Sequence, residues 1–301
     1  MSRPPHPRET LERCALRAQL RGDPMLGTAF PAARLLLVEQ PGPWGTRGLA
    51  DSRFGAEAAT ALERRAARSG VRVQAIRRPG RTPRAAARRW ALVDTRHAQE
   101  SLVWGEYAGS SELLELPLDG STGTPDRDPA YLVCAHSKHD TCCALRGRPV
   151  AAAIADLRPG RVWECSHLGG DRFAANVLVL PAGLLYGRVL PFAAPEFVAA
   201  AEHGEVIGAL LRGRIGFPAA AQAALAYAHE HLALRRRRDL QVVSVTTAAN
   251  RSVIVRLLGP HGEFDVLVQV ETVNAAGLTC HNQQPNQYLA HRPVSLVPVD
   301  A

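Results

Sequence analysis

The sequence predicts an α/β protein built from two similar halves and a smaller α+β lobe at the C-terminus. Three observations carry this prediction. Short apolar runs bounded by glycine and proline alternate with segments of helical periodicity, which is the pattern of strands alternating with helices. The same order of strands and helices occurs twice along the first two-thirds of the chain. With 301 residues, of which 46% are hydrophobic, the chain can bury more than one core.

The first half begins with an apolar strand at residues 33–38, which ends in a turn rich in proline and glycine. Helical periodicity predicts a helix at 55–68, and alternation of apolar and polar residues predicts a strand at 71–76. Two further short strands are predicted at 88–94 and 101–105. Together these elements predict a compact α/β unit.

The second half follows residues 120–128, a segment rich in Ser, Thr, Pro, Gly and Asp that forms the clearest internal boundary. Its predicted elements are a strand at 130–134, a helix at 144–157, strands at 160–164, 175–180 and 183–189, and a helix at 195–203. This order is that of a thioredoxin-like fold. We therefore expect two thioredoxin-like halves, at residues 1–127 and 128–204, although the halves share no convincing sequence match.

The remaining residues, 205–301, are expected to form an accessory α+β lobe. Its predicted elements are helices at 205–212 and 218–234, followed by strands at 241–247, 252–258 and 264–270. Pro218 suits the first turn of the second of these helices, because its missing N–H would have no partner there.

The charge of the chain bears on its partners. The formal net charge is +8, and Lys138 is the one lysine among the cationic side chains. A basic surface attracts anionic partners without selecting among them. We expect a redox protein, whose identity the sequence does not reveal, in preference to nucleic acid.

The N-terminal residues 1–20 lack the continuous apolar core of a signal peptide. No window of the chain approaches the ~18 apolar residues of a membrane span. We therefore expect a cytoplasmic protein without membrane attachment. In that reducing compartment the six cysteines are expected to be free, catalytic or metal-binding rather than disulfide-bonded.

Four of the six cysteines gather in two motifs that follow successive predicted strands. The motifs are Cys134-Ala-His-Ser-Lys-His-Asp-Thr-Cys142-Cys143 and Cys165-Ser-His-Leu-Gly-Gly-Asp-Arg-Phe-Ala-Ala-Asn176. Thiolates and imidazoles are the side chains that bind iron–sulfur clusters. Because the two loops would lie side by side in a thioredoxin-like sheet, we expect a pair of ligands from each.

These motifs resemble those of the sucrase/ferredoxin-like proteins, whose ferredoxin domain has a thioredoxin-like fold. The resemblance is strongest over residues 131–176 and weaker at 27–31, 37–45 and 77–81, so it spans about the first two-thirds of the chain. The family pattern is Cys-x-His…Asp-x-x-Cys followed by His-x-Gly-Gly-His-x-x-Ala-x-Asn. In the family, the two cysteines of the first motif and the two histidines of the second bind the cluster.

Carried over to this chain, the resemblance implies cluster ligands at Cys134, Cys143 and His167. The family's second histidine is replaced by Asp171. We expect Asp171 to be the fourth ligand, since it retains the spacing. A carboxylate is more anionic than imidazole, so it should lower the reduction potential of a [2Fe–2S] cluster.

Other cysteines offer alternatives to this ligand set. Cys165 could supply the fourth ligand, although it is expected to lie on the strand and point inward. Cys142 could replace Cys143, because only one of two adjacent side chains is expected to face the site. Cys14 and Cys280 are isolated in the sequence, and we expect them to be core or surface thiols rather than ligands.

Three polar residues of the first motif are interpreted as structural. His136 and His139 are expected to be polar groups of the loop. Asp140 is well placed to cap the helix predicted at 144–157, with a hydrogen bond to a metal ligand as its alternative role.

The sequence thus predicts an electron carrier rather than an enzyme. A thiol oxidoreductase is disfavoured, because no Cys-x-x-Cys lies between the first strand and helix of either half. Sucrose hydrolysis is disfavoured because aromatic residues make up only 5% of the chain and no paired-carboxylate motif is present. A zinc site and a binding module without a cluster remain open alternatives.

Overall fold

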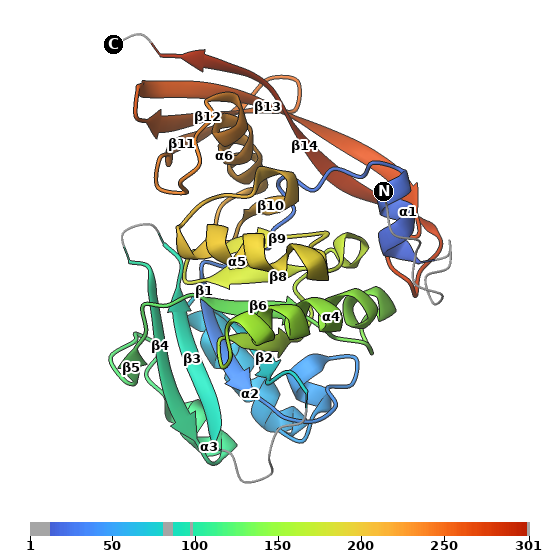
Figure 1. The fold of residues 1–301 in the computed structure, drawn as a ribbon, viewed down its shortest axis with the longest axis vertical. Coiled ribbons are helices and arrows are strands. Elements are labelled where there is room, and N and C mark those ends of the chain that lie inside the picture. The colour runs from blue at the N-terminus through green and yellow to red at the C-terminus, as the bar shows by residue number, and fades with distance from the viewer. Residues whose placement is uncertain (1–12, 81–86, 97–98, 300–301) are drawn as a thin grey trace.

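The computed structural model describes residues 13–80, 87–96 and 99–299, which contain one mixed sheet and one antiparallel sheet (Figure 1). The predicted α/β class is therefore confirmed. Part of the N-terminal segment used to predict the location of the protein, residues 1–12, lies outside the described residues. Within the described part, no helix has both the length and the apolar character needed to cross a membrane.

The mixed sheet has ten strands. They are β1 (Arg34–Glu39), β2 (Val71–Arg77), β3 (Arg88–Asp94), β4 (Ser101–Tyr107), β5 (Thr124–Pro125), β6 (Ala130–Cys134), β7 (Val162–Cys165), β8 (Val177–Leu180), β9 (Leu184–Tyr186) and β10 (Leu211–Arg214). Their order across the sheet is β10-β9-β8-β6-β7-β2-β1-β3-β4-β5. One continuous sheet therefore crosses the predicted boundaries at 127/128 and 204/205.

The sheet repeats one arrangement of strands. The order β2-β1-β3-β4 in the first half matches β7-β6-β8-β9 in the second. In each half the first two strands in the chain are parallel, and the other neighbours are antiparallel. The halves join through an antiparallel contact between β2 and β7. The repeat predicted from the order of elements is thus present in the strand arrangement.

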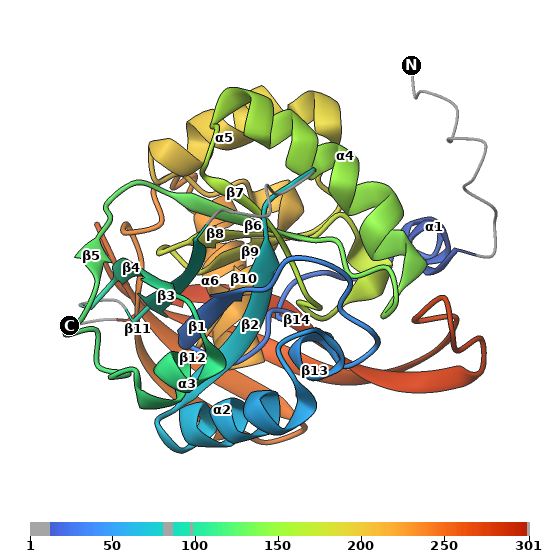
Figure 2. The same cartoon turned by 90° about the horizontal axis from the view of Figure 1, so that it is seen from below.

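Six helices surround the sheets in the described residues. They are α1 (Cys14–Leu20), α2 (Ala56–Arg68), α3 (Ser110–Glu115), α4 (Thr141–Leu157), α5 (Ala194–Glu202) and α6 (Ala219–His231). Figure 2 shows α2 on one side of the mixed sheet and α4 and α5 on the other.

The faces of the two halves that carry no helix pack on each other. Their shared core includes Leu35 and Leu37 of β1, Leu132 of β6 and Leu178 of β8, all of them fully buried. The alternate residues of the same strands point outward to the helices, as Leu36 does in the core beneath α2. Burying each such leucine contributes about 1.5–3 kcal/mol, so the halves stabilise each other as one body.

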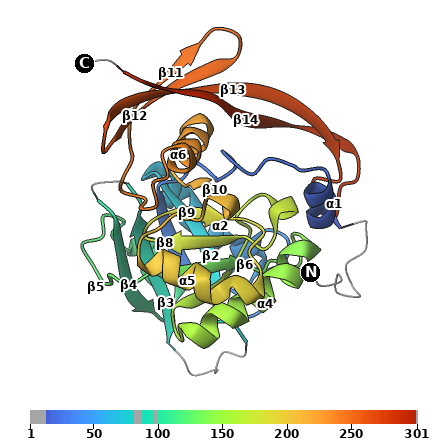
Figure 3. The same cartoon turned by 45° about the horizontal axis from the view of Figure 1, so that its top comes forward.

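The C-terminal sheet consists of β11 (Gln241–Ala248), β12 (Ser252–Gly259), β13 (Gly262–Ala276) and β14 (Pro285–Pro298), in that order. Helix α6 packs on one of its faces. The ribbon formed by β13 and β14 extends past α6 to α1 at the other side of the molecule (Figures 1 and 3). The turn at its end, residues 277–284, therefore lies beside the N-terminal helix.

The structure corrects several predicted elements. The prediction of a helix at 205–212 is wrong. That segment contains a short 3-10 turn, Gly208–Leu210, which is followed by strand β10. Strand β10 pairs with β9, and all four of its residues are buried, so tertiary pairing decides its structure. Helices α1 and α3 and strands β5, β10 and β14 were not predicted. The helix expected at 144–157 begins earlier, at Thr141.

Candidate metal centre

The ends of β6 and β7 place the two cysteine motifs next to each other. These strands are parallel neighbours, and their register pairs Cys134 with Cys165. Because both strands run in the same direction, the loops that follow them leave the same edge of the sheet. The expectation that the two loops lie side by side is confirmed.

The start of α4 brings a second cysteine to Cys134. The carboxylate of Asp140 accepts a hydrogen bond from the backbone N–H of Cys142 at 2.8 Å, so the predicted helix cap is confirmed. One turn after Cys143, Gly147 lies so close to the end of β6 that a Cβ atom there would overlap the carbonyl oxygen of Cys134. This close approach of helix and strand holds the Cys143 side chain toward Cys134.

The side chain of Arg212 packs against the loop that follows β7 and holds it in place. Gly170 has a left-handed backbone (φ +68°), and a Cβ atom there would lie 2.5 Å from the guanidinium of Arg212. The guanidinium donates hydrogen bonds to the carbonyl of Gly169 at 2.8 Å and to the side-chain oxygen of Asn176 at 2.9 Å. Asn176 in turn donates to the carbonyl of Gly170 at 3.0 Å. Together these contacts set the path of the chain toward Asp171.

The four expected ligands converge at this edge of the sheet. The ligand atoms of Cys134, Cys143 and His167 all lie within 4.8 Å of one another. The Cys143 thiol donates to Oδ1 of Asp171 at 3.1 Å, and the same oxygen lies 3.0 Å from Nδ1 of His167. Cys134, Cys143 and Asp171 are buried, whereas the His167 side chain is 27% exposed. We call these four residues the first cluster.

His139 adds an imidazole that the sequence analysis treated as a loop residue. Its ring centroid lies 3.7 Å from that of His167, and its Nε2 lies 3.8 Å from Oδ2 of Asp171. His136, by contrast, contacts the backbone of another loop, through a 2.7 Å hydrogen bond between its Nε2 and the carbonyl of Gly45. His139 is therefore a further candidate ligand. Its position four residues before Cys143, between two other polar motif residues, gave no signal that distinguished it from His136.

The first cluster holds opposite charges close together. Burial opposes ionisation of His167, but its interactions with Asp171 and Cys134 prevail and raise its pKa to about 9. Burial also opposes ionisation of Asp171, yet His167 and the Cys143 thiol lower its pKa. Hydrogen bonding from Cys143 lowers the pKa of Cys134. These shifts favour the charged forms of Cys134, His167 and Asp171, and a metal would displace a proton from His167 and one from Cys143.

The alternative ligands lie elsewhere. Cys165 is fully buried in the core shared by the two halves, as expected for an inward-pointing strand residue. Cys142 faces away from Cys143 and joins Asp140 in a different group of side chains. That group also contains Cys14 and Cys280, which are isolated in the sequence but lie together in the folded chain. We call Cys14, Asp140, Cys142 and Cys280 the second cluster.

Arg212 is a site residue that the sequence analysis missed. It lay in the segment predicted as helix 205–212, where an arginine is expected to face solvent. In residues 211–215 charged residues alternate with apolar or small ones, a pattern that also predicts a strand. An arginine on the inward face of such a strand needs a buried partner, and this requirement was the signal that could have identified Arg212.

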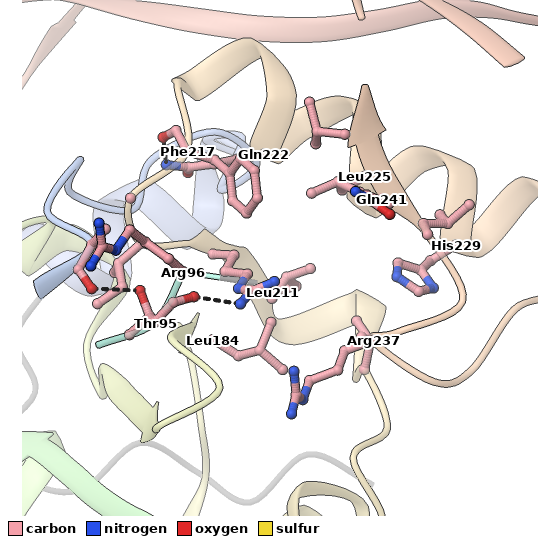
Figure 4. Close-up of a pocket in the computed structure, with 17 residues that line it drawn as sticks. Thr95, Arg96, Leu184, Leu211, Phe217, Gln222, Leu225, His229, Arg237 and Gln241 are labelled. Atoms are coloured by element: carbon pink, nitrogen blue, oxygen red, sulfur yellow. Dashed lines mark hydrogen bonds between the residues drawn. The ribbon is translucent and has the colours of Figure 1, made fainter. Parts of the chain in front are cut away.

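A cavity of about 240 Å³ lies apart from both clusters, between α6, β10 and the start of β11. Figure 4 shows its lining, in which apolar side chains such as Leu184, Leu211 and Phe217 predominate. Thr95 donates a hydrogen bond to the carbonyl of Ala33 at its edge. None of the cysteines of either cluster contributes to its wall, so it adds no ligand to the metal centre.

Buried cysteines beside a histidine and an aspartate, at the strand ends of an α/β fold, define a candidate metal centre with mixed sulfur, nitrogen and oxygen ligands. Comparison with known families identifies the family of the chain. A model of the sucrase/ferredoxin-like family matches residues 25–213, and the chain belongs to this family. The matched segment contains all of the first cluster, while Cys14 and Cys280 lie outside it.

Among characterised sequences, the chain is similar to altered inheritance of mitochondria protein 32 of Candida glabrata. The two are 29% identical over 101 residues, which cover 29% of this chain and 32% of that protein. The chain thus matches about a third of the length of this relative. No solved structure matches the chain.

Proposed function

We propose that the protein is an electron carrier that binds a [2Fe–2S] cluster through Cys134, Cys143, His167 and Asp171. The observation that carries the proposal is the convergence of these four side chains at the ends of β6 and β7. Membership of the sucrase/ferredoxin-like family supports it, because Cys134, Cys143 and His167 match the family's ligand motif and Asp171 stands at its fourth position. When bound, such a cluster accepts and releases single electrons.

The repeated strand arrangement supports a thioredoxin-like description of each half. Both halves have two parallel strands joined through a helix, followed by an antiparallel pair. In the second half, the end of the first strand supplies Cys134 and the start of the next helix supplies Cys143, while the loop after the second strand supplies His167 and Asp171. The proposed cluster would therefore lie at one edge of this half.

The charge of the surroundings fits an anionic centre. Arg212 is fully buried. Within the described residues its guanidinium donates to the carbonyls of Gly169 and Thr28, the side-chain oxygen of Asn176 and the hydroxyl of Thr28, and to no carboxylate. A buried cation without a paired carboxylate is costly unless another negative charge lies near. Two thiolates and the carboxylate of Asp171 around a metal group would supply that charge.

Exposure differs across the first cluster in a way that suits electron transfer. The cysteines are buried, which keeps water from the sulfur side, whereas the His139 and His167 side chains are 37% and 27% exposed. The imidazole side is therefore the shortest way from the site to solvent. We expect a redox protein to dock there, and the cytoplasmic location stays a prediction.

A single zinc ion is the second candidate for the first cluster. The ligand atoms of Cys134, Cys143 and His167 lie within 4.8 Å of one another, and Asp171 contacts both Cys143 and His167. Two cysteines with a histidine and a carboxylate suit tetrahedral zinc. A zinc ion would leave the protein without redox activity at this site. Iron and sulfide analysis distinguishes the two.

The test is an anaerobic preparation of the recombinant protein, with an absorption spectrum and iron and acid-labile sulfide measured per chain. We expect visible charge-transfer bands and equal amounts of iron and sulfide. Cys143→Ser should abolish both, whereas Cys142→Ser, on the adjacent residue, should retain them. A colourless protein that contains zinc in this site, or that takes up no iron on reconstitution, would overturn the proposal.

A further inference from the structure

The second cluster gathers three cysteines and an aspartate around one point. The Sγ atom of Cys280 lies 3.3 Å from that of Cys142 and 3.5 Å from that of Cys14. The Cys14 sulfur lies 3.7 Å from both carboxylate oxygens of Asp140. All four ligand atoms lie within 4.8 Å of one another. None of these residues belongs to the first cluster.

These spacings are nearer to those of ligands around a single ion than to those of a disulfide. A tetrahedral zinc site with Zn–S bonds of about 2.3 Å places its sulfur atoms about 3.8 Å apart. Sulfurs joined in a disulfide would instead lie about 2.0 Å apart. Three thiolates and a carboxylate complete a closed tetrahedral shell, which is the arrangement of structural rather than catalytic zinc.

The carboxylate of Asp140 is held in place by backbone donors. Its Oδ1 accepts from the N–H of Cys142 at 2.8 Å, and its Oδ2 accepts from the N–H of Cys280 at 2.7 Å. Each donor belongs to a residue whose own side chain is in the cluster. Such backbone hydrogen bonds orient a ligand before the metal arrives, and each oxygen retains a lone pair for the ion.

The four residues come from three segments far apart in the sequence. Cys14 opens α1, Asp140 and Cys142 lie at the start of α4, and Cys280 lies in the turn between β13 and β14 (Figure 3). Cys14 and Cys142 are buried, and Cys280 is partly exposed, so the ion could enter from the turn. An ion here would join the N-terminal helix and the end of the ribbon to the body of the protein.

We propose that Cys14, Asp140, Cys142 and Cys280 bind one structural zinc ion. The inference does not depend on the electron-transfer proposal, because it uses none of the first cluster's ligands. Binding would release the thiol protons to solvent and change no oxidation state. The ion would bind α1, α4 and the β13–β14 turn to one another.

The experiment is metal analysis of anaerobically prepared protein, compared across two reciprocal variants. The wild-type chain and Cys143→Ser should each hold one zinc ion per chain. Cys280→Ser should lose the zinc while keeping the iron and sulfide of the first cluster, if that cluster is present. Cys280 lies in a turn, so this variant should fold, which circular dichroism can check.

A cobalt titration gives a second readout that does not require a folded Cys280 variant. Cys143→Ser, depleted of zinc and titrated with Co²⁺ alone, should develop the absorption bands of a tetrahedral thiolate site at one equivalent. The proposal would be overturned if no zinc copurifies and no such bands form. It would also be overturned if the anaerobic protein proves to hold a disulfide between Cys142 and Cys280.

Discussion

The two clusters lie at the same end of helix α4 and differ in how the chain builds them. The first draws all its residues from positions 134–171, inside the family-matched segment. The second joins residues from α1, α4 and the β13–β14 turn, and two of its cysteines lie outside that segment. Of the two adjacent residues at the start of α4, Cys143 belongs to the first cluster and Cys142 to the second. A local motif therefore suffices for one cluster, whereas the other needs the complete fold.

The largest expected difference between the clusters concerns stability. In Cys143→Ser, free zinc at about a thousand times its dissociation constant should raise the free energy of unfolding by about 4 kcal/mol, because it binds only the folded chain. Cys143→Ser/Cys280→Ser should show no such gain. The measurement is denaturant unfolding with and without zinc, and equal gains in both variants would remove the second cluster as the zinc site.

Arg212→Gln tests whether the first cluster depends on a residue outside its own two motifs. The substitution leaves the Gly169 carbonyl and the Asn176 side chain without their charged donor, so it should cost about 3 kcal/mol in unfolding free energy. Arg96→Gln is the matched control, since Arg96 forms an exposed ion pair with Asp94 and its loss should cost less than about 1 kcal/mol. Similar costs would mean that Arg212 does not support the site.

Asp171→His sharpens the comparison by restoring the family's ligand type in the first cluster alone. Replacing a carboxylate by a neutral imidazole should raise the reduction potential of a bound cluster by on the order of 100 mV, since it removes a negative charge from the iron. Zinc content at the second cluster should not change. Redox titration followed by absorption gives the potential, and an unchanged value would exclude Asp171 as a ligand.

The smallest expected effect is a difference in pH dependence between the two metal-free clusters. Burial raises the pKa of Asp140 to about 6, and the interactions of His167 raise its pKa to about 9. Both folded-state values lie above the unfolded ones, so each residue stabilises the fold at low pH and loses that effect as pH rises. Asp140 should lose it between about pH 4 and 6 and His167 between about pH 6.5 and 9.

Unfolding of the metal-free protein across pH 4–9 measures both windows. Asp140→Asn should remove the lower one and His167→Gln the upper one. If either variant keeps the complete wild-type profile, the charge assignment of that cluster is wrong.

Much of the mixed sheet could be predicted, because its strands are short apolar runs and its helices are periodic. The alternation of Leu35, Leu36 and Leu37 between two cores cannot be read from an uninterrupted apolar run, since both faces of β1 are buried. Strand β10 was missed because residues 205–212 were predicted to form a helix, whereas Leu211–Arg214 pairs with β9 as a strand.

The candidate site divides in the same way. The convergence of Cys134, Cys143, His167 and Asp171 followed from motif spacing and resemblance, since neighbouring strand ends bring their loops together. The second cluster could not be predicted, because nothing near Cys14 or Cys280 in the sequence indicates that α1 meets the turn of a ribbon more than two hundred residues away.

The order in which the chain is synthesised gives the β13–β14 turn a further consequence. The first cluster has its four ligands and the supporting Arg212 once β10 has left the ribosome, so it could be filled while the C-terminal sheet is still unmade. The second cluster stays incomplete until Cys280 emerges and the turn between β13 and β14 reaches α1 and α4. Zinc at that position would therefore distinguish finished chains from truncated ones, and a chain that stops after β10 would keep the first cluster without the second.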